Sequence, residues 1–224
     1  MVGCWAIWEW RNKVVFDGVE VEPERVVRRV EDVLCDLAEV EREGCVRSEG
    51  GRARDVESGN DGWKAASVGF MKLNVNAGLK EGEGVGTGVV CRNDKGEVLW
   101  GASIVREQCW DPEMAEAVAV IDGLLEVRDR GIQDVEVESD CLRVIEALKE
   151  RRQGRSMLAM VFDDIHLICN SFRYVVWLYT SRINNSVAHA LAHVLPRVSG
   201  KTLWSDVLPP STNTAALFDL SLLS

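Results

Sequence analysis

The 224-residue chain has no apolar run long enough to span a lipid bilayer. Its first residues do not combine a basic stretch with a clean apolar segment, so we do not expect a secretory signal. The seven cysteines are scattered, odd in number and never spaced as C-x-x-C, a pattern typical of free thiols in a reducing compartment. We therefore expect an intracellular protein of the nucleus or cytoplasm, neither secreted nor bound to a membrane.

Basic residues are also in the minority. The chain has 26 Lys and Arg against 36 Asp and Glu, which gives a formal net charge of −10. This balance argues against a dedicated high-affinity nucleic-acid-binding protein. With 46% hydrophobic and 28% charged residues, the composition is that of an ordinary globular protein. The length is sufficient for one domain with a proper core plus extra segments.

The chain divides into four segments by pattern. Residues 1–43 combine a tryptophan-rich start with an amphipathic helix whose apolar side chains form one stripe between Pro23 and Gly44. Residues 44–62 are rich in Gly, Ser and charged side chains, which indicates a flexible linker. Residues 63–196 have the density of a folded domain, and 197–224 form a tail. We assign the helix stripe to packing within or between chains, with assembly as an alternative role.

The folded segment alternates strand and helix patterns. Strands are predicted at 72–76, 84–92, 97–105, 134–139 and 172–180, the first of them running into a glycine turn at Gly78. Helices are predicted at 112–130, 141–152, 157–170 and 186–194, with Asp111 and Asp140 as N-caps of the first two. This order predicts an α/β fold with a five-stranded mixed sheet, three antiparallel strands and then two parallel ones, flanked by helices.

Four polar side chains are expected to converge at one edge of this sheet. Asn76 ends the first strand, Asp140 follows the fourth, Glu116 lies in the first turns of a helix, and His189 lies on the last helix. Right-handed crossovers place the ends of parallel strands at one edge. Oxygen ligands gathered there would suit Mg²⁺. Two such ions can activate a water and stabilise the leaving oxygen of a phosphodiester.

Several segments resemble the ribonuclease H type 1 domain, in the form found in plant reverse-transcriptase-like proteins derived from non-LTR retrotransposons. The matching stretches cover roughly 63–195 and are Trp63-Lys64, Lys72-Leu-Asn-Val-Asn76, Gly86-x-Gly-x-Val-x-Arg92-x-Asp94-x-Gly96, Asp111-Pro-x-x-Ala115-Glu116-Ala117, Val137-Glu-Ser-Asp140 and Arg182-x-Asn184-x-x-x-Ala188-His189-x-Leu191-Ala192. The segments around Trp8 and Trp204 are similar to those that flank this domain in such elements. The resemblance therefore implies the terminal piece of a longer polyprotein.

The resemblance implies an endonuclease that cleaves the RNA of RNA–DNA hybrids with two Mg²⁺ (or Mn²⁺) ions. Such a domain recognises its substrate by shape, backbone and 2′-hydroxyl groups, not by sequence. The family's four metal ligands, Asp, Glu, Asp and Asp, fall on Asn76, Glu116, Asp140 and His189. Glu116 and Asp140 match and are the expected metal ligands, whereas Asn76 and His189 depart. The formal ligand charge falls from −4 to −2, so we expect weakened metal binding and very slow or absent cleavage.

Simpler interpretations of these residues stay open. Asn76 could be a turn residue, Glu116 a solvated acid favoured by the helix dipole, and Asp140 an N-cap alone. His189 and His193 have the i, i+4 spacing of a zinc pair, but the usual further ligands are absent nearby.

Four other residues are candidate nucleic-acid contacts. Arg151, Arg152 and Arg155 form a basic run that could touch phosphates, or could only offset the dipole of the helix that it ends. Asn74 lies near the same sheet edge as Asn76 and could touch sugar hydroxyls. Two functional hypotheses result. One is a nucleic-acid-binding ribonuclease H-like protein of retrotransposon origin with impaired catalysis. The alternative is a non-catalytic nucleic-acid-binding or protein-interaction module with the same fold.

Overall fold

The computed structural model describes residues 62–80, 84–151, 156–194, 199–205 and 207–221. The predicted N-terminal helix and nearly all of the predicted linker lie outside the described residues. No helix in the described ranges is both long and apolar enough to cross a bilayer. The cysteines within these ranges, Cys91, Cys109, Cys141 and Cys169, are free thiols.

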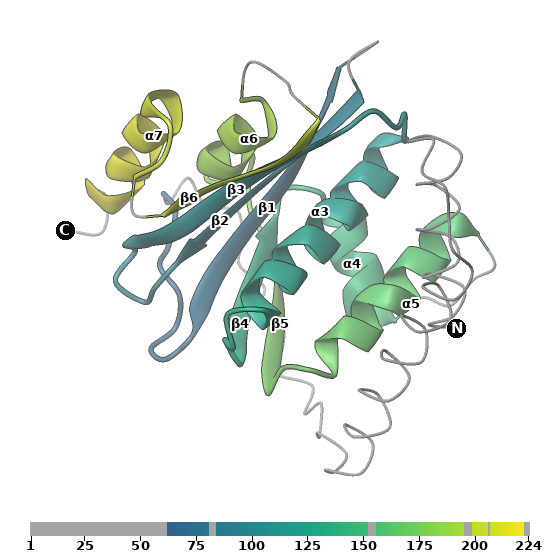
Figure 1. Ribbon diagram of the computed structural model, residues 1–224. Helices are drawn as coiled ribbons and strands as arrows, with labels where there is room; N and C mark the ends of the chain where they lie inside the picture. The colour runs from purple at the N-terminus through teal and green to yellow at the C-terminus, as the bar shows by residue number, and fades with distance from the viewer. Residues whose placement is uncertain (1–61, 81–83, 152–155, 195–198, 206, 222–224) are drawn as a thin grey trace. The chain divides into compact units, whose positions relative to one another are not determined.

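A six-stranded mixed sheet forms the centre of the domain (Figure 1). Its strands are β1 (Met71–Lys80), β2 (Gly84–Arg92), β3 (Val98–Arg106), β4 (Asp134–Ser139), β5 (Tyr174–Tyr179) and β6 (Gly200–Ser205), arranged in the order β5-β4-β1-β2-β3-β6. β1, β2, β3 and β6 pair antiparallel, whereas β4 runs parallel to β1 and β5 runs parallel to β4. The mixed sheet is the predicted one with a strand added.

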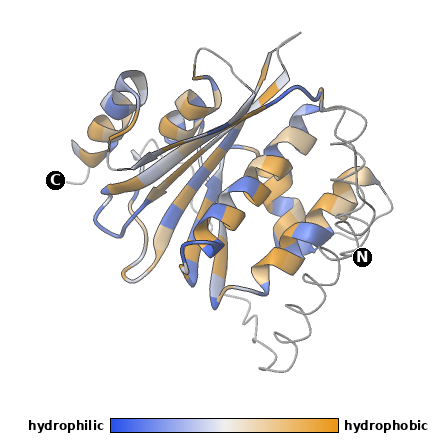
Figure 2. Cartoon of the chain, in the orientation of Figure 1, coloured by the Kyte–Doolittle hydropathy of each residue, from blue (hydrophilic) through white to orange (hydrophobic). Residues whose placement is uncertain are grey.

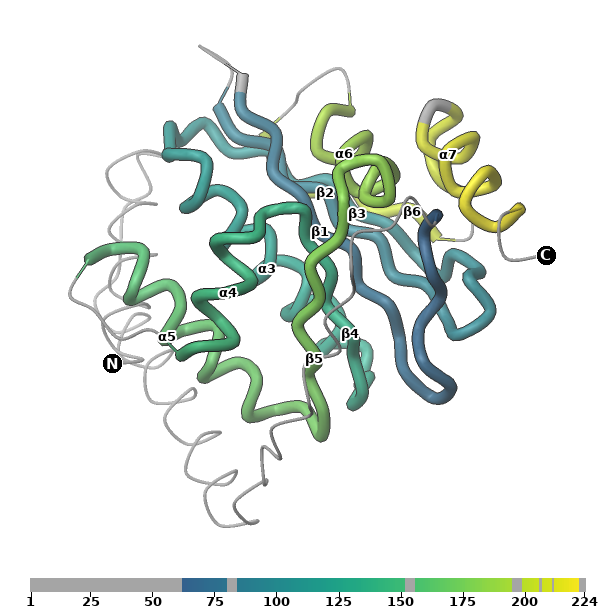
Figure 3. Tube along the Cα trace, turned by 180° about the vertical axis from the view of Figure 1, so that it is seen from behind, coloured from purple at the N-terminus to yellow at the C-terminus, as the bar shows by residue number. Residues whose placement is uncertain are grey.

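Helices cover both faces of this sheet. The described helices are α3 (Pro112–Arg128), α4 (Leu142–Glu150), α5 (Met157–Cys169), α6 (Ser186–Ala192) and α7 (Pro210–Ser221). Seen from either side, α3, α4 and α5 lie together on one face, and α6 and α7 lie on the other (Figures 1 and 3). The predicted N-cap of α3 is confirmed, because the Asp111 carboxylate accepts a hydrogen bond from the Met114 amide.

The larger hydrophobic core lies between the sheet and α3, α4 and α5. Leu73 and Val75 of β1 are fully buried there, together with Leu124 of α3 and Ile165 of α5. Figure 2 shows hydrophobic residues along these helices. A smaller cluster that includes Val90, Leu191 and Leu208 lies under α6 and α7. Burial of apolar area on both faces stabilises the three layers.

β1 does not stop at Asn76, so the glycine turn predicted at Gly78 is wrong. The strand continues to Lys80, and Gly78 pairs with Gly86 of β2. Gly78 and Gly88 make room for α6 instead of bending the chain. A Cβ atom added at Gly88 would lie 2.1 Å from the carbonyl oxygen of Ala188, and one at Gly78 would lie 2.7 Å from the ring of His193. The small residues let α6 approach the sheet closely enough to bring His189 beside β1.

The predicted tail contains a strand and a helix. β6 pairs with β3 at the edge of the sheet, and its mostly exposed residues lack the alternation that would have identified it. Arg92 of β2, which is 1% exposed, forms a buried ion pair with Asp219 of α7, with 2.8 Å between Nη1 and Oδ2. This pair ties the C-terminal helix to the sheet.

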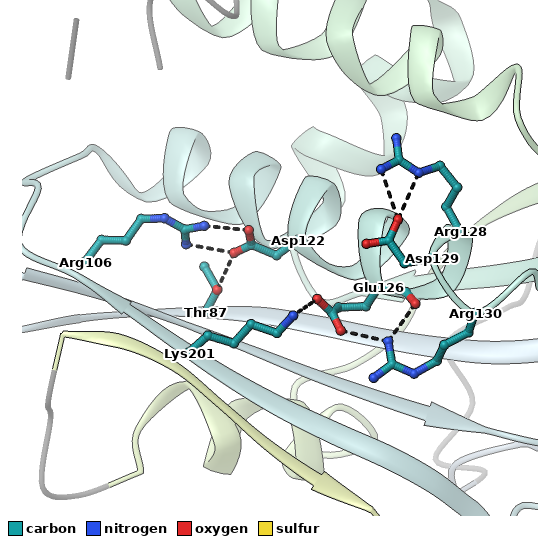
Figure 4. A network of polar contacts seen from close by, with 8 residues as sticks. All are labelled: Thr87, Arg106, Asp122, Glu126, Arg128, Asp129, Arg130 and Lys201. Carbon is teal, nitrogen blue, oxygen red and sulfur yellow. Dashed lines mark hydrogen bonds and ion pairs between the residues drawn. The ribbon is translucent and has the colours of Figure 1, made fainter. Parts of the chain in front are cut away.

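A polar network joins α3 to the strands beneath it (Figure 4). Asp122 accepts hydrogen bonds from the Thr87 hydroxyl and from two nitrogens of Arg106. One turn along the helix, Glu126 pairs with Lys201 of β6 and with Arg130. The network supplies the added strand with a polar anchor on α3.

Candidate active site

The structure brings Asn76, Glu116, Asp140 and His189 together at one edge of the sheet. The Asn76 amide nitrogen Nδ2 lies 2.6 Å from Asp140 Oδ1 and 3.3 Å from Glu116 Oε1. On its other side, the Asn76 oxygen Oδ1 lies 3.0 Å from His189 Nδ1. Four elements, β1, α3, the end of β4 and α6, therefore meet at a single asparagine side chain.

The sheet register explains how these residues meet. β4 pairs in parallel with β1 as far as Asn74 and Glu138, so Asn76 and Asp140, each two residues further on, lie side by side on one face. β1 then continues beyond the end of β4. Its Ala77 amide has no strand partner on that side and donates instead to Glu116 Oε1 at 3.1 Å. This bond holds a side chain of α3 at the strand.

Asp140 is not an N-cap, which corrects one of the open interpretations. The N-cap of α4 is Cys141, with no side-chain capping bond. Asp140 Oδ1 accepts hydrogen bonds from Asn76 and, at 3.0 Å, from Asn185 Nδ2. Asn185 is fully buried, and its Nδ2 also donates to the Val75 carbonyl of β1 at 2.9 Å. The carboxylate is thus held by two side-chain amides.

Sequence reasoning missed Asn185 and Arg182. Both lie just before α6, Arg182 as the first residue of a segment that the resemblance had singled out. No sequence signal identifies Asn185, because its side chain makes no capping bond and its burial is visible only in the structure. Arg182 is exposed, and its Nη2 lies 3.4 Å from His189 Nε2. It extends the cluster toward solvent.

The hydrogen bonds define the orientation of each group. Asn76 directs its NH₂ group at two carboxylates, so its oxygen faces His189 and can only accept. His189 Nδ1 must then carry the proton that it donates to that oxygen. In the neutral imidazole, Nε2 is left as an acceptor for the Arg182 guanidinium. One continuous chain of donors runs from Arg182 through His189 and Asn76 to the carboxylates.

Burial shifts the pKa values of Glu116 and His189 in the directions that favour their neutral forms. Burial raises the pKa of Glu116 to about 8, with the Asp140 charge acting in the same direction and the Ala77 amide opposing it. Glu116 Oε2 is buried without a hydrogen-bond partner. The pKa of His189 is lowered, first by burial and then by His193 and Arg182. Near pH 7, Glu116 is mostly protonated and His189 is neutral.

The ribonuclease H resemblance implies two Mg²⁺ ions at this cluster, and the residues present do not fit them. One oxygen of each carboxylate, Glu116 Oε1 and Asp140 Oδ1, accepts two N–H groups. The amide nitrogen of Asn76 stands between them. Within the described ranges, no group of three or more His, Cys, Asp or Glu side chains is arranged to hold a metal ion. His189 and His193 therefore belong to no such group among these residues.

The candidate nucleic-acid contacts lie elsewhere. Asn74 is fully buried, donates to Glu138 Oε2 at 2.7 Å and accepts from Trp63 Nε1 at 3.3 Å, so its side chain is unavailable to a sugar hydroxyl. Arg151 is exposed at the far end of α4, in the left-handed region with φ +49°. Arg152 and Arg155 lie outside the described residues. The phosphate role of these arginines stays a prediction.

A family model described as reverse transcriptase-like matches residues 74–194. The chain belongs to the reverse transcriptase-like family. The matched residues of this family member include all four residues of the cluster. No curated protein matched the sequence.

Solved ribonuclease H structures share the fold of this reverse transcriptase-like chain. Ribonuclease H1 from Halobacterium salinarum is 19% identical, with a TM-score of 0.52 over 55% of this chain and 95% of that one. The N-terminal ribonuclease H domain of a Mycobacterium tuberculosis protein is 19% identical, with a TM-score of 0.51 over 68% and 99%. LC11 ribonuclease H1, solved with an RNA/DNA hybrid, is 22% identical, with a TM-score of 0.50 over 55% and 94%. The described domain therefore has the ribonuclease H fold.

Proposed function

We propose that this chain is a ribonuclease H-like protein of retrotransposon origin that binds RNA–DNA hybrids and no longer cleaves them at an appreciable rate. Membership of the reverse transcriptase-like family supports the nucleic-acid partner. So does the fold shared with ribonucleases H, one of which was solved with a hybrid. The flanking segments, similar to those of plant non-LTR elements, support the origin.

One observation carries the loss of cleavage, namely that the Asn76 amide donates to both remaining carboxylates. Metal-assisted hydrolysis needs oxygen ligands that are free to hold two cations about 4 Å apart. Here the asparagine amide occupies the space between the ligands and donates an N–H group to one oxygen of each. A cation would have to displace those hydrogen bonds.

The reduced negative charge of the cluster also supports the loss of cleavage. A carboxylate and a unit positive charge about 4 Å apart attract by roughly 4 kcal/mol at an effective dielectric of 20. Asn76 and His189 each remove one such attraction, because each stands where the resemblance implies a carboxylate. Two adjacent dications would lose several of these attractions together, so weak binding of one Mg²⁺ or Mn²⁺ at Glu116 and Asp140 is the most that the cluster supports.

A second candidate function is a protein-interaction module with the same fold. The net charge of −10 favours it, because an acidic protein repels a polyanion at a distance. A binding titration of the purified chain with a labelled hybrid at several salt concentrations separates the two functions. Binding that weakens as salt rises supports the nucleic-acid function. Absence of binding even at low salt favours the protein-interaction module.

The cleavage test uses a labelled hybrid with Mg²⁺ or Mn²⁺ and three proteins, the unaltered chain, Asn76→Asp, and the Asn76→Asp/His189→Asp double variant. We expect no cutting by the unaltered chain and measurable cutting by the double variant, which restores four carboxylates. Asn170→Asp is the matched control, since Asn170 is an exposed residue that ends α5 away from the cluster. Robust cutting by the unaltered chain would refute the loss of cleavage.

A further inference from the structure

An arginine stands at the edge of the cluster with most of its donors available. Arg182 is exposed, and among the described residues no carboxylate lies within ion-pair distance of it. Its hydrogen bond is with His189, where Nη2 donates to Nε2 at 3.4 Å. A guanidinium has five N–H donors in a planar fork. One of them goes to the histidine, and the others are free to meet an anion.

The two departures from the family pattern act on this arginine together. Asn76 presents its oxygen to His189 because its NH₂ group is held by Asp140 and Glu116. His189 therefore donates from Nδ1 and accepts at Nε2, and that acceptor faces Arg182. An aspartate at position 76 with an aspartate at position 189 would offer no such relay. Asn76 and His189 therefore act together to orient the guanidinium of Arg182.

One oxygen of each carboxylate behind the arginine already accepts two N–H groups. Four N–H donations, from Asn76 to both carboxylates and from Ala77 and Asn185 to one each, reach Glu116 Oε1 and Asp140 Oδ1. With both acids counted as ionised, the cluster and Arg182 sum to −1, against −3 for four carboxylates and the same arginine. An incoming phosphate therefore meets little uncompensated negative charge.

We propose that Arg182, oriented by His189, holds a backbone phosphate of the bound nucleic acid without any divalent cation. The inference rests on the proposed function, since it names how that site takes its ligand. Arginine suits this role because its fork matches two phosphate oxygens at once. His189 and Asn76 are positioning residues here, and Arg182 alone contacts the ligand.

The test measures the affinity of the full-length chain for a labelled RNA–DNA hybrid across a series of KCl concentrations. Each series is run once in EDTA and once in Mg²⁺ at matched ionic strength. The unaltered chain should bind equally, within about twofold, in the two conditions. Arg182→Ala should weaken binding about tenfold and reduce the slope of log K against log salt by about 0.9, the signature of one lost phosphate contact.

Two further variants make the result specific. Arg182→Lys retains the charge and should keep the salt slope with a smaller loss of affinity, because the ammonium lacks the planar fork. Arg128→Ala removes an exposed arginine at the far end of α3, paired only locally with Asp129, and should stay within about twofold of the unaltered chain. His189→Ala should lower the affinity severalfold with the salt slope largely retained, because the arginine is then present but not oriented.

The outcomes separate this inference from the function on which it rests. If the unaltered chain binds no nucleic acid at any salt concentration, the proposed function itself is wrong. If the chain binds but Arg182→Ala changes neither affinity nor slope, the function stands and the arginine site is refuted. Binding that requires Mg²⁺ would also refute it, because a cation would then be supplying the phosphate contact.

Discussion

Replacing Asn76 with aspartate tests whether the amide takes the place of a cation. The change puts an acid where an amide nitrogen now lies 2.6 Å from Asp140 Oδ1 and 3.3 Å from Glu116 Oε1. At an effective dielectric of 20, two unit charges 2.6 Å apart repel by about 6 kcal/mol, whereas Glu116 adds little because it is mostly protonated near pH 7. Movement of the side chains and proton uptake relieve most of this, and we expect a net loss of about 3 kcal/mol in unfolding free energy.

The assay is thermal unfolding of the full chain with and without Mg²⁺. A loss of about 3 kcal/mol should lower the Tm of Asn76→Asp by roughly 6–12 °C in EDTA. Mg²⁺ at about one hundred times its Kd should raise the unfolding free energy of Asn76→Asp by about 2.7 kcal/mol, because it binds only the folded form. The unaltered chain should not respond to Mg²⁺, and Asn170→Asp should change stability by less than about 1 kcal/mol. A Tm of Asn76→Asp equal to that of the unaltered chain, or a Mg²⁺-dependent rise in the unaltered chain, would refute the reasoning.

Three other changes probe the site and its support. Because burial raises the folded-state pKa of Glu116 from 4.5 to about 8, the folded chain keeps a proton that the unfolded chain releases. The unfolding free energy should therefore fall from about pH 5 to about pH 8, and Glu116→Gln should flatten this profile in urea titrations; an equal slope in both proteins would contradict the shift. Asp219→Ala leaves the buried Arg92 charge unpaired and should cost about 3–5 kcal/mol in the same titrations, whereas a cost under about 1 kcal/mol would mean that the pair is solvated. Gly88→Ala places a Cβ atom 2.1 Å from the Ala188 carbonyl oxygen of α6 and should cost about 2 kcal/mol or more and weaken hybrid binding. Gly69→Ala, with nothing within 4 Å and only a positive φ to strain it, should cost about 1–2 kcal/mol and leave binding intact.

The order of the strands and helices, together with the family resemblance, predicted which residues meet. The parallel pairing of β1 and β4 brings Asn76 and Asp140 to one edge, and the family resemblance added His189. The structure places all of them within one hydrogen-bonded cluster with Glu116. The catalytic and metal-binding roles given to these residues stay predictions.

Details that depend on packing could not be predicted. Gly78 has the local sequence pattern of a turn. Only the structure shows that its lack of a side chain allows α6 to pack closely against β1. Asp140 has the sequence position of a cap, but two amides from distant segments compete for its carboxylate. β6 has too few buried residues to show a strand period and depends on β3 and on Glu126 of α3 for its place.

Crystals of the full chain grown in Mn²⁺ would test the central claim most directly, through an anomalous difference map around Glu116 and Asp140. We predict no manganese peak between these carboxylates, with Asn76 Nδ2 within hydrogen-bonding distance of both. Two manganese ions bound there, or one at full occupancy with the Asn76 amide turned away or coordinating through its oxygen, would contradict the account.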